Sequence, residues 1–245
     1  MKEIGSSVHI MNSLSTSRRK IVVYGRGYQP RFFEFVASLT GKEIPRLCYL
    51  PTASGDHEQG IINWYEACAK FKVQPFYQKM FISSYDQQES FEEVLLSMDG
   101  IIVGGGNTLN MMAIWNAQGV DVILKKAWDV GIVLAGGSAG SLCWFEEGTT
   151  DSRPKHLSKV NGLGFIKGSH CPHYDAEPGR RPLYHQYIKD GVLKPGYAVD
   201  NNAAIYFEDN EAKKVVALDE NSNAYFVSLN NGEVVEDRLV KELLE

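Results

Sequence analysis

Short apolar runs alternate with amphipathic stretches along most of the chain. The runs at 20–24, 46–50, 100–103 and 132–134 predict buried strands, and a less regular run at 73–77 is interrupted by Pro75. Apolar residues recur at helical spacing at 32–39, 58–71, 91–98, 109–115 and 120–128. Strands that alternate with helices in this way predict an α/β fold, with a mainly parallel, doubly wound sheet and helices on both faces.

The pattern changes after residue 196. Short strand-like runs at 203–207, 214–218, 224–229 and 233–235 are separated by Asp, Asn and Gly, and the Asn-Asn-Gly sequence at 230–232 is typical of a hairpin turn. We expect an antiparallel C-terminal extension of the same sheet, closed by a helix over 238–244. Residues 1–18 are largely polar and lack a clear period, so we predict a loose N-terminal extension followed by a single domain over 19–245.

One predicted strand ends in a glycine-rich corner that carries a serine. The strand at 132–134 leads into Ala-Gly-Gly-Ser-Ala-Gly at 135–140, and residues 141–147 can start a helix. A serine on a strand-to-helix corner projects its Oγ out of the fold, and small neighbours let backbone N–H groups approach the atom that it attacks. Ser138 is therefore the candidate nucleophile.

A second glycine-rich loop follows the strand at 100–103. Its Gly-Gly-Gly-Asn-Thr sequence at 104–108 matches neither a P-loop nor a full dinucleotide-binding fingerprint. Because the loop precedes a helix, it suits a source of oxyanion-hole N–H groups. Both glycine-rich loops are expected beyond the carboxyl ends of parallel strands, where functional groups gather. Asn107, in the same loop, is a candidate substrate-binding residue.

A serine nucleophile needs a base, and the base needs an acceptor that orients it. Among the six histidines, His173 is preferred because it follows a predicted strand end in the unit after Ser138. His170, in the same segment, is its competitor. Asp151 and Asp200 are both candidates for the orienting acid, and the residues themselves leave this choice open.

The composition of the chain indicates which partners and which compartment are expected. The net charge of −5 gives no electrostatic footprint for nucleic acid or an anionic membrane, and no apolar stretch approaches the ~20 residues that span a bilayer. Four scattered cysteines and the absence of a signal-peptide core favour a reduced, cytoplasmic protein. No His, Cys and carboxylate cluster has metal-ligand spacing, so we predict neither a metal nor a cofactor.

Four motifs together resemble a known peptidase family. In chain order they are Val-Gly-Gly-Gly-Asn-Thr at 103–108, Gly-Ser-Ala-Gly at 137–140, Thr-Thr-Asp-Ser at 149–152 and Pro-His-Tyr at 172–174. They resemble the S51 serine peptidases, which include dipeptidase E and cyanophycinase. The resemblance implies a fold like that of class I glutamine amidotransferases (flavodoxin-like), with Ser138 as nucleophile and His173 as base. It also implies an oxyanion hole built from N–H groups of Gly105 or Gly106 and of Ala139.

The resemblance leaves the acid open between Asp151 and Asp200. It also implies an arginine downstream of the histidine that binds an aspartyl carboxylate in dipeptidase E, for which Arg181, next to Arg180, is the candidate here. We therefore expect a peptidase that cleaves small peptides, with Asp-Xaa dipeptides as candidate substrates, through an acyl-enzyme on Ser138. A homodimer is compatible with this interpretation.

Two other hypotheses remain. One is a non-catalytic module of the same fold whose glycine-rich loops hold a small anion, and the other is a cyanophycinase-like hydrolase. A glutaminase of the amidotransferase type is disfavoured, because the corner carries Ser138 and the nearest thiol, Cys143, lies five residues further on.

Overall fold

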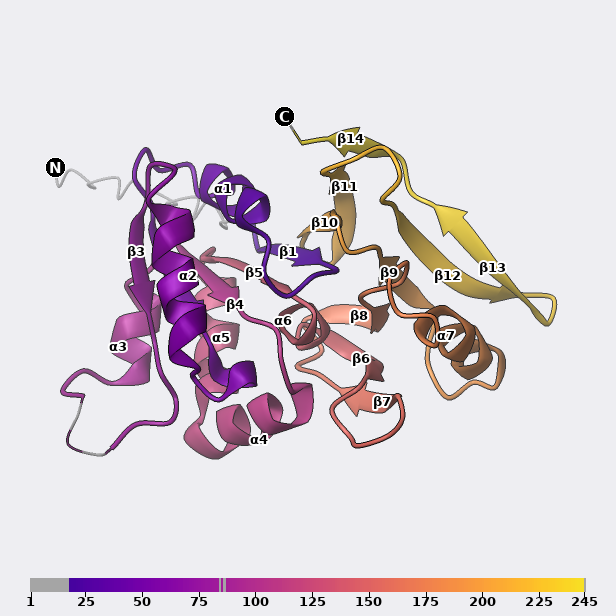
Figure 1. Cartoon of the computed structure of the whole chain (residues 1–245), viewed down its shortest axis with the longest axis horizontal. Helices are drawn as coiled ribbons and strands as arrows, with labels where there is room; N and C mark the ends of the chain where they lie inside the picture. The colour runs from indigo at the N-terminus through magenta and orange to yellow at the C-terminus, as the bar shows by residue number, and fades with distance from the viewer. Residues whose placement is uncertain (1–17, 84, 86, 245) are drawn as a thin grey trace, which may run out of the picture.

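The strands of the chain form two sheets (Figure 1). The computed structural model describes residues 18–83, 85 and 87–244, so the predicted extension over 1–18, apart from Arg18, lies outside the described residues. Within the described part, an eight-stranded sheet has the order β14-β11-β10-β1-β5-β4-β2-β3, and a six-stranded sheet has the order β13-β12-β9-β8-β6-β7. The chain is thus a mixed α/β protein.

The parallel part of the first sheet follows the strand pattern predicted from the sequence. It consists of β1 (Lys20–Tyr24), β5 (Val133–Gly137), β4 (Gly100–Val103), β2 (Arg46–Leu50) and β3 (Gln74–Tyr77). Each pairs in parallel with the next in that order. The carboxyl ends of these strands therefore share one edge of the sheet, and the loops that follow them meet there.

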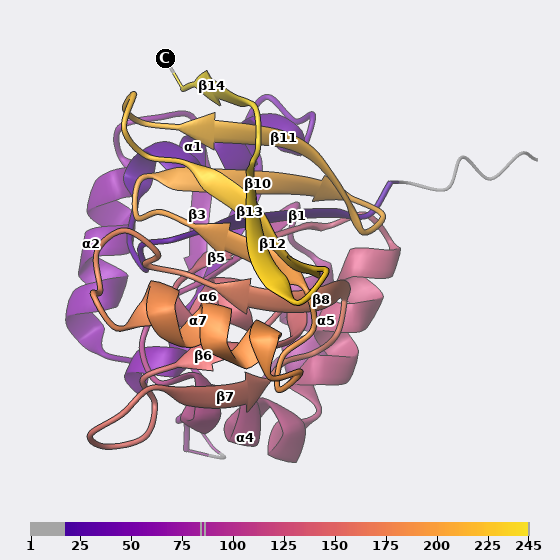
Figure 2. The same ribbon diagram turned by 90° about the vertical axis from the view of Figure 1, so that its right-hand side faces the viewer.

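Helices cover both faces of these parallel strands. They are α1 (Pro30–Leu39), α2 (Glu58–Cys68), α3 (Phe91–Leu96), α4 (Thr108–Gln118) and α5 (Val120–Asp129). Buried residues of α1 and α2 pack in one apolar cluster with Val22, whereas those of α3, α4 and α5 pack in another with Ile21 and Val23. Successive strand residues point to opposite faces, which explains this division. Figure 2 shows α2 on one side of the strands and α5 on the other.

Further strands lengthen the first sheet through both antiparallel and parallel pairing, and the remaining strands build the second. The first sheet gains β10 (Ala203–Glu208), β11 (Glu211–Ala217) and β14 (Lys241–Leu243). The second contains β6 (Phe145–Thr150), β7 (Ser158–Asn161), β8 (Ile166–Cys171), β9 (Gly196–Val199), β12 (Ala224–Asn230) and β13 (Glu233–Arg238). Helix α7 (Arg180–Lys189) packs on this sheet through Tyr184 and Ile188 (Figure 2).

Three details of the sequence-based prediction are wrong. The C-terminal strands do not all extend one sheet, because β12 pairs with β9 of the second sheet. The helix expected over 238–244 is instead strand β14, which satisfies the otherwise free edge of β11. The helix expected over 141–147 ends early, since short α6 (Ala139–Leu142) is followed at once by β6, whose Phe145 is buried in the core.

Candidate active site

Ser138 lies at a strained corner between β5 and α6. Its backbone has φ 56° and ψ −119°, a conformation that a residue with a side chain rarely adopts. The corner is held by hydrogen bonds: the Ser138 N–H donates to the Tyr24 carbonyl at 3.3 Å, and the Ser138 carbonyl accepts from the Ser141 and Leu142 N–H groups at 3.0 Å. The surrounding structure therefore fixes the direction of the serine side chain.

The glycines around Ser138 are required by close backbone contacts. A Cβ on Gly137 would lie 2.1 Å from the Arg26 carbonyl oxygen, and one on Gly140 would lie 2.2 Å from the Val103 carbonyl oxygen. No side chain fits at either position without moving the main chain of the loop after β1 or of β4. The small residues around Ser138 thus let β4 and the loop after β1 pack closely against the end of β5.

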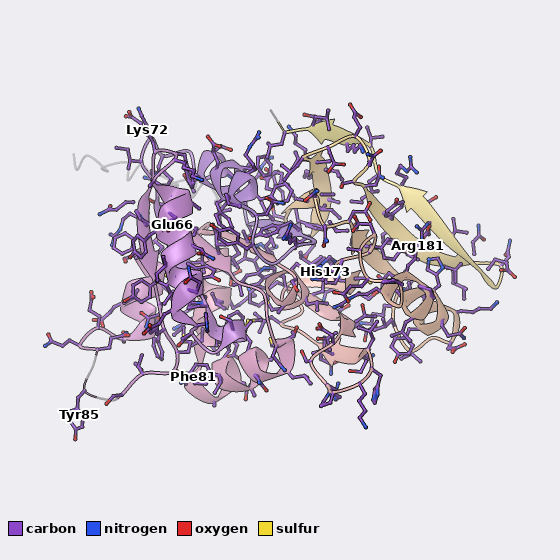
Figure 3. The ribbon with its side chains drawn as sticks, in the orientation of Figure 1. Glu66, Lys72, Phe81, Tyr85, His173 and Arg181 are labelled. Carbon is purple, nitrogen blue, oxygen red and sulfur yellow. The ribbon has the colours of Figure 1, made fainter. Side chains whose placement is uncertain are left out.

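His173 and Asn201 complete a chain of hydrogen bonds that starts at Ser138. The Ser138 Oγ lies 2.8 Å from Nε2 of His173, and Nδ1 of His173 lies 2.7 Å from Oδ1 of Asn201. An amide oxygen only accepts, so Nδ1 carries the hydrogen and Nε2 keeps its lone pair for the serine hydroxyl. This is the tautomer that a general base requires. The loop of His173 follows β8, and Figure 3 shows its side chain in the middle of the molecule.

Asn201 was not selected from the sequence. It follows β9, the parallel neighbour of β8, so the ends of these two strands bring it to His173. Its backbone N–H donates to the Asp175 carboxylate at 2.8 Å, which ties the two loops together. The signal in the sequence was the strand end at 197–199, which pointed to the neighbouring Asp200 instead.

Neither carboxylate proposed as the orienting acid bonds to His173. The Asp200 carboxylate accepts the N–H of Asn223 at 2.7 Å and is almost completely buried, and this burial raises its pKa to about 6. The Asp151 carboxylate is 65% exposed and lies 3.5 Å from the Arg180 guanidinium. Both side chains point to other partners, so the prediction for this position is corrected to Asn201.

His170, the competitor of His173, is fully buried beneath the corner. Its Nδ1 lies 3.0 Å from the Tyr197 carbonyl oxygen and its Nε2 lies 2.8 Å from the Ser141 hydroxyl, while its ring stacks on Phe145. Burial lowers the pKa of His170 to about 3. The Ser141 hydroxyl in turn donates to the Ser138 carbonyl at 2.8 Å. His170 therefore contacts Ser141, which holds the backbone of the corner, whereas the Ser138 hydroxyl bonds to His173.

The residues expected to form the oxyanion hole surround Ser138. A Cβ on Gly105 would lie 3.3 Å from the Ser138 Cβ, which shows how closely this loop approaches the serine. Gly106 has φ 141°, a value open to glycine, and Ala139 is the first residue of α6. Gly105, Gly106 and Ser138 line one pocket with a volume of about 520 Å³.

The two residues predicted to bind substrate both bond to other protein groups. Asn107 caps α4: its Oδ1 accepts the Asn110 N–H at 2.9 Å and its Nδ2 donates to the Ser152 carbonyl at 3.0 Å. Arg181 pairs with the carboxylate of Glu236 on β13. Arg181 belongs to α7, and Figure 3 shows its label away from that of His173. Neither residue lines the Ser138 pocket.

Several residues of the pocket were not identified from the sequence. Those that line it are Arg26, Gly27, Tyr28, Tyr49, Ser54, His57, Gly60, Asn63, Gly105, Gly106 and Ser138. They come from β2 itself, from the loops after β1, β2, β4 and β5, and from α2. The Gly-Arg-Gly sequence at 25–27 was the available signal, because it follows a strand that neighbours the strand of the nucleophile.

The four cysteines are buried free thiols. No group of three or more His, Cys, Asp and Glu side chains within residues 18–83, 85 and 87–244 could hold a metal ion. In the same part of the chain, no helix combines the length and apolar character needed to cross a membrane.

Comparisons with known proteins agree on one family. The sequence profile of "Peptidase family S51" matches residues 22–215. The uncharacterized peptidase YgaJ of Bacillus subtilis (strain 168) is 41% identical over 203 residues, which are 83% of this chain and 86% of YgaJ.

Two solved structures share the fold. A peptidase from an acI-B1 Actinobacterium superposes with a TM-score of 0.71 at 17% identity, covering 92% of this chain and 96% of that one. A candidate peptidase E protein from Listeria monocytogenes EGD-e gives a TM-score of 0.59 at 15% identity, covering 91% of this chain and 100% of that one.

Proposed function

The chain belongs to peptidase family S51, and from this premise we propose that it is a serine peptidase with Ser138 as nucleophile and His173 as base. The observation that carries the proposal is the 2.8 Å contact between the Ser138 Oγ and His173 Nε2 at a strained strand-to-helix corner. The two-faced parallel sheet supports a doubly wound arrangement like that of class I glutamine amidotransferases.

In the first step His173 accepts the hydroxyl proton while the Ser138 Oγ bonds to the scissile carbonyl carbon. Asn201 holds the imidazole in the reactive tautomer through its bond to Nδ1. Because the amide is neutral, it orients the ring without adding a negative charge that would stabilise the imidazolium. Asn201 thus takes the position for which Asp151 and Asp200 were considered.

The carbonyl oxygen becomes negative as the tetrahedral intermediate forms. The N–H groups of Ala139 and of Gly105 or Gly106 are the proposed donors to it, since these residues surround Ser138. His173 then gives its proton to the leaving amine as the C–N bond breaks, which leaves an ester on Ser138. Water, deprotonated by the same His173, hydrolyses this ester and restores the hydroxyl.

The proposed substrates are small peptides, with Asp-Xaa dipeptides as first candidates. A pocket of about 520 Å³ suits a peptide of a few residues. We place the protein in the cytoplasm, because four buried free thiols suit a reducing compartment.

The test is labelling with a fluorophosphonate, which reacts with activated serines, combined with hydrolysis of dipeptides and cyanophycin-like branched peptides. We expect the wild type to be labelled, and Ser138→Ala and His173→Gln to lose both labelling and hydrolysis. Ser54→Ala is the matched control, because Ser54 lines the same pocket but its hydroxyl bonds only to the Pro51 carbonyl.

Three outcomes separate the hypotheses. Labelling or hydrolysis that survives in Ser138→Ala contradicts the proposal. A folded wild type that is not labelled favours a non-catalytic anion-binding module. Hydrolysis of branched peptides alone favours a cyanophycinase-like hydrolase.

A further inference from the structure

One arginine in the Ser138 pocket has no partner among the residues that the structure describes. Arg26 is exposed and lines the pocket, and within the described residues its guanidinium makes no hydrogen bond or ion pair. Arg180 and Arg181, by contrast, are paired with Glu177 and Glu236. An unpaired guanidinium beside a nucleophile is available to a ligand.

The position of Arg26 is fixed by its backbone. Its carbonyl oxygen would be 2.1 Å from a Cβ on Gly137, and a Cβ on the next residue, Gly27, would lie 3.0 Å from the Cα of Gly105 and 3.5 Å from the Ser138 Cβ. The loop after β1 is therefore wedged between the serine corner and the second glycine-rich loop. This packing keeps Arg26 at the mouth of the pocket.

The pocket is lined by a positively charged side chain and by no negatively charged one. Its lining includes Arg26, His57 and Asn63 but no Asp or Glu. The acid next to His57 in the chain, Asp56, is buried and accepts the N–H groups of Met80 and Phe81 instead. A positive group of a substrate would find no counter-charge here, whereas a carboxylate would find the guanidinium fork that matches its geometry.

We infer that Arg26 is a specificity-determining residue of this pocket and binds a carboxylate of the peptide substrate. The inference rests on the proposed peptidase function. It transfers the carboxylate-binding role from Arg181, which is held by Glu236, to the loop after β1. The carboxylate has two sources in a small peptide, an acidic side chain and the C-terminus.

The test uses four matched peptides: Asp-Leu, Asn-Leu and the C-terminal amide of each. The kcat/KM of wild type, Arg26→Gln and Arg31→Gln is measured on all four. Arg31 is the matched control, since it is exposed, lies five residues away on α1 and bonds only to the Leu244 carbonyl. Unfolding curves of the variants check that folding is unchanged.

We expect Arg26→Gln to lower kcat/KM about 10- to 100-fold for peptides that carry the recognised carboxylate, and to leave their neutral isosteres nearly unchanged. If the acidic side chain is recognised, Arg26→Gln removes the preference for Asp over Asn. If the C-terminus is recognised, it removes the preference for the free carboxylate over the amide. Arg26→Lys should restore part of the preference, because it keeps the charge but loses the fork.

The inference is overturned if Arg26→Gln changes all four peptides by the same factor or changes none. A binding measurement separates failure of this inference from failure of the peptidase function. Calorimetry measures the binding of the same peptides to Ser138→Ala and to the double variant Ser138→Ala/Arg26→Gln. A wild type that neither cleaves these peptides or the branched ones nor is labelled by the fluorophosphonate contradicts the peptidase function alone. The calorimetry then still decides whether Arg26 binds the carboxylate.

Discussion

The side-chain oxygen of Asn201 lies 2.7 Å from Nδ1 of His173, where a Ser-His-Asp arrangement has a carboxylate. A neutral acceptor fixes the tautomer and the direction of the ring, but it leaves the charge of the imidazolium without a negative partner at Nδ1. The residue at position 201 therefore decides whether a positive charge on the ring has a negative partner at Nδ1.

Asn201→Asp should move the acidic limb of the kcat/KM profile to higher pH by about one unit, because a carboxylate beside Nδ1 stabilises the protonated ring. Asn201→Ala should lower kcat by about 100-fold, since the ring loses its orientation. Rates on a cleaved dipeptide from pH 5 to 9 measure both effects. Asp200→Asn is the control, and a shift of similar size toward lower pH in that variant would show that charge near the loop, and not the contact with Nδ1, sets the profile.

Replacement of Ser138 by glycine should stabilise the protein relative to replacement by alanine. The φ of 56° and ψ of −119° disfavour any side chain, so Ser138→Ala keeps the strain and Ser138→Gly releases it. We expect a difference in the free energy of unfolding of about 1 kcal/mol, with both variants inactive. Urea unfolding of the two variants measures it, and equal stabilities would mean that the corner stores no strain.

The sequence predicts the nucleophile and its base for steric reasons that are local. A run of small residues around Ser138 has few explanations other than close backbone approach, and His173 follows the strand end of the next unit. The alternation of apolar runs likewise predicts the parallel strands and both helical faces. These features depend on neighbours in the chain.

The partners from distant segments could not be predicted in the same way. The choice between Asp200 and Asn201 depends on the pairing of β9 with β12, which places the Asn223 N–H against Asp200 and turns the next residue toward His173. Arg26 becomes a pocket residue only because β1 lies beside β5. The strand β14 exists because β11 has a free edge, a fact that no local pattern of apolar residues encodes.

Asp200 should make the protein less stable as the pH rises from about 4 to about 6. Burial raises its folded-state pKa to about 6 from 3.8, so across this range the folded state keeps a proton that the unfolded chain has lost. Asp200→Asn removes this loss. The free energy of unfolding of Asp200→Asn minus that of wild type should therefore be larger at pH 7 than at pH 4, by on the order of 2 kcal/mol. Chemical unfolding at the two pH values measures it, and a difference that does not vary with pH would contradict the role of burial.

His170 has the opposite effect in the same range of pH. Burial lowers its folded-state pKa to about 3 from 6.5, so below pH 6.5 the unfolded chain binds a proton that the folded state excludes, and stability falls as the pH is lowered. Between pH 4 and 6 the contributions of His170 and Asp200 nearly cancel, which predicts a flat profile for wild type from these two groups. Asp200→Asn exposes the His170 contribution, and its stability should rise with pH by roughly 1.4 kcal/mol per unit.

The double variant Asp200→Asn/His170→Gln supplies the control, because it lacks both groups and should lose that slope. Unfolding free energies measured at pH 4.5, 5.5 and 6.5 for wild type, Asp200→Asn and the double variant decide the matter. A slope that persists in the double variant would assign the pH dependence to other groups. A slope that disappears only when His170 is replaced shows that the imidazole beside the Ser141 hydroxyl stays neutral in the folded protein.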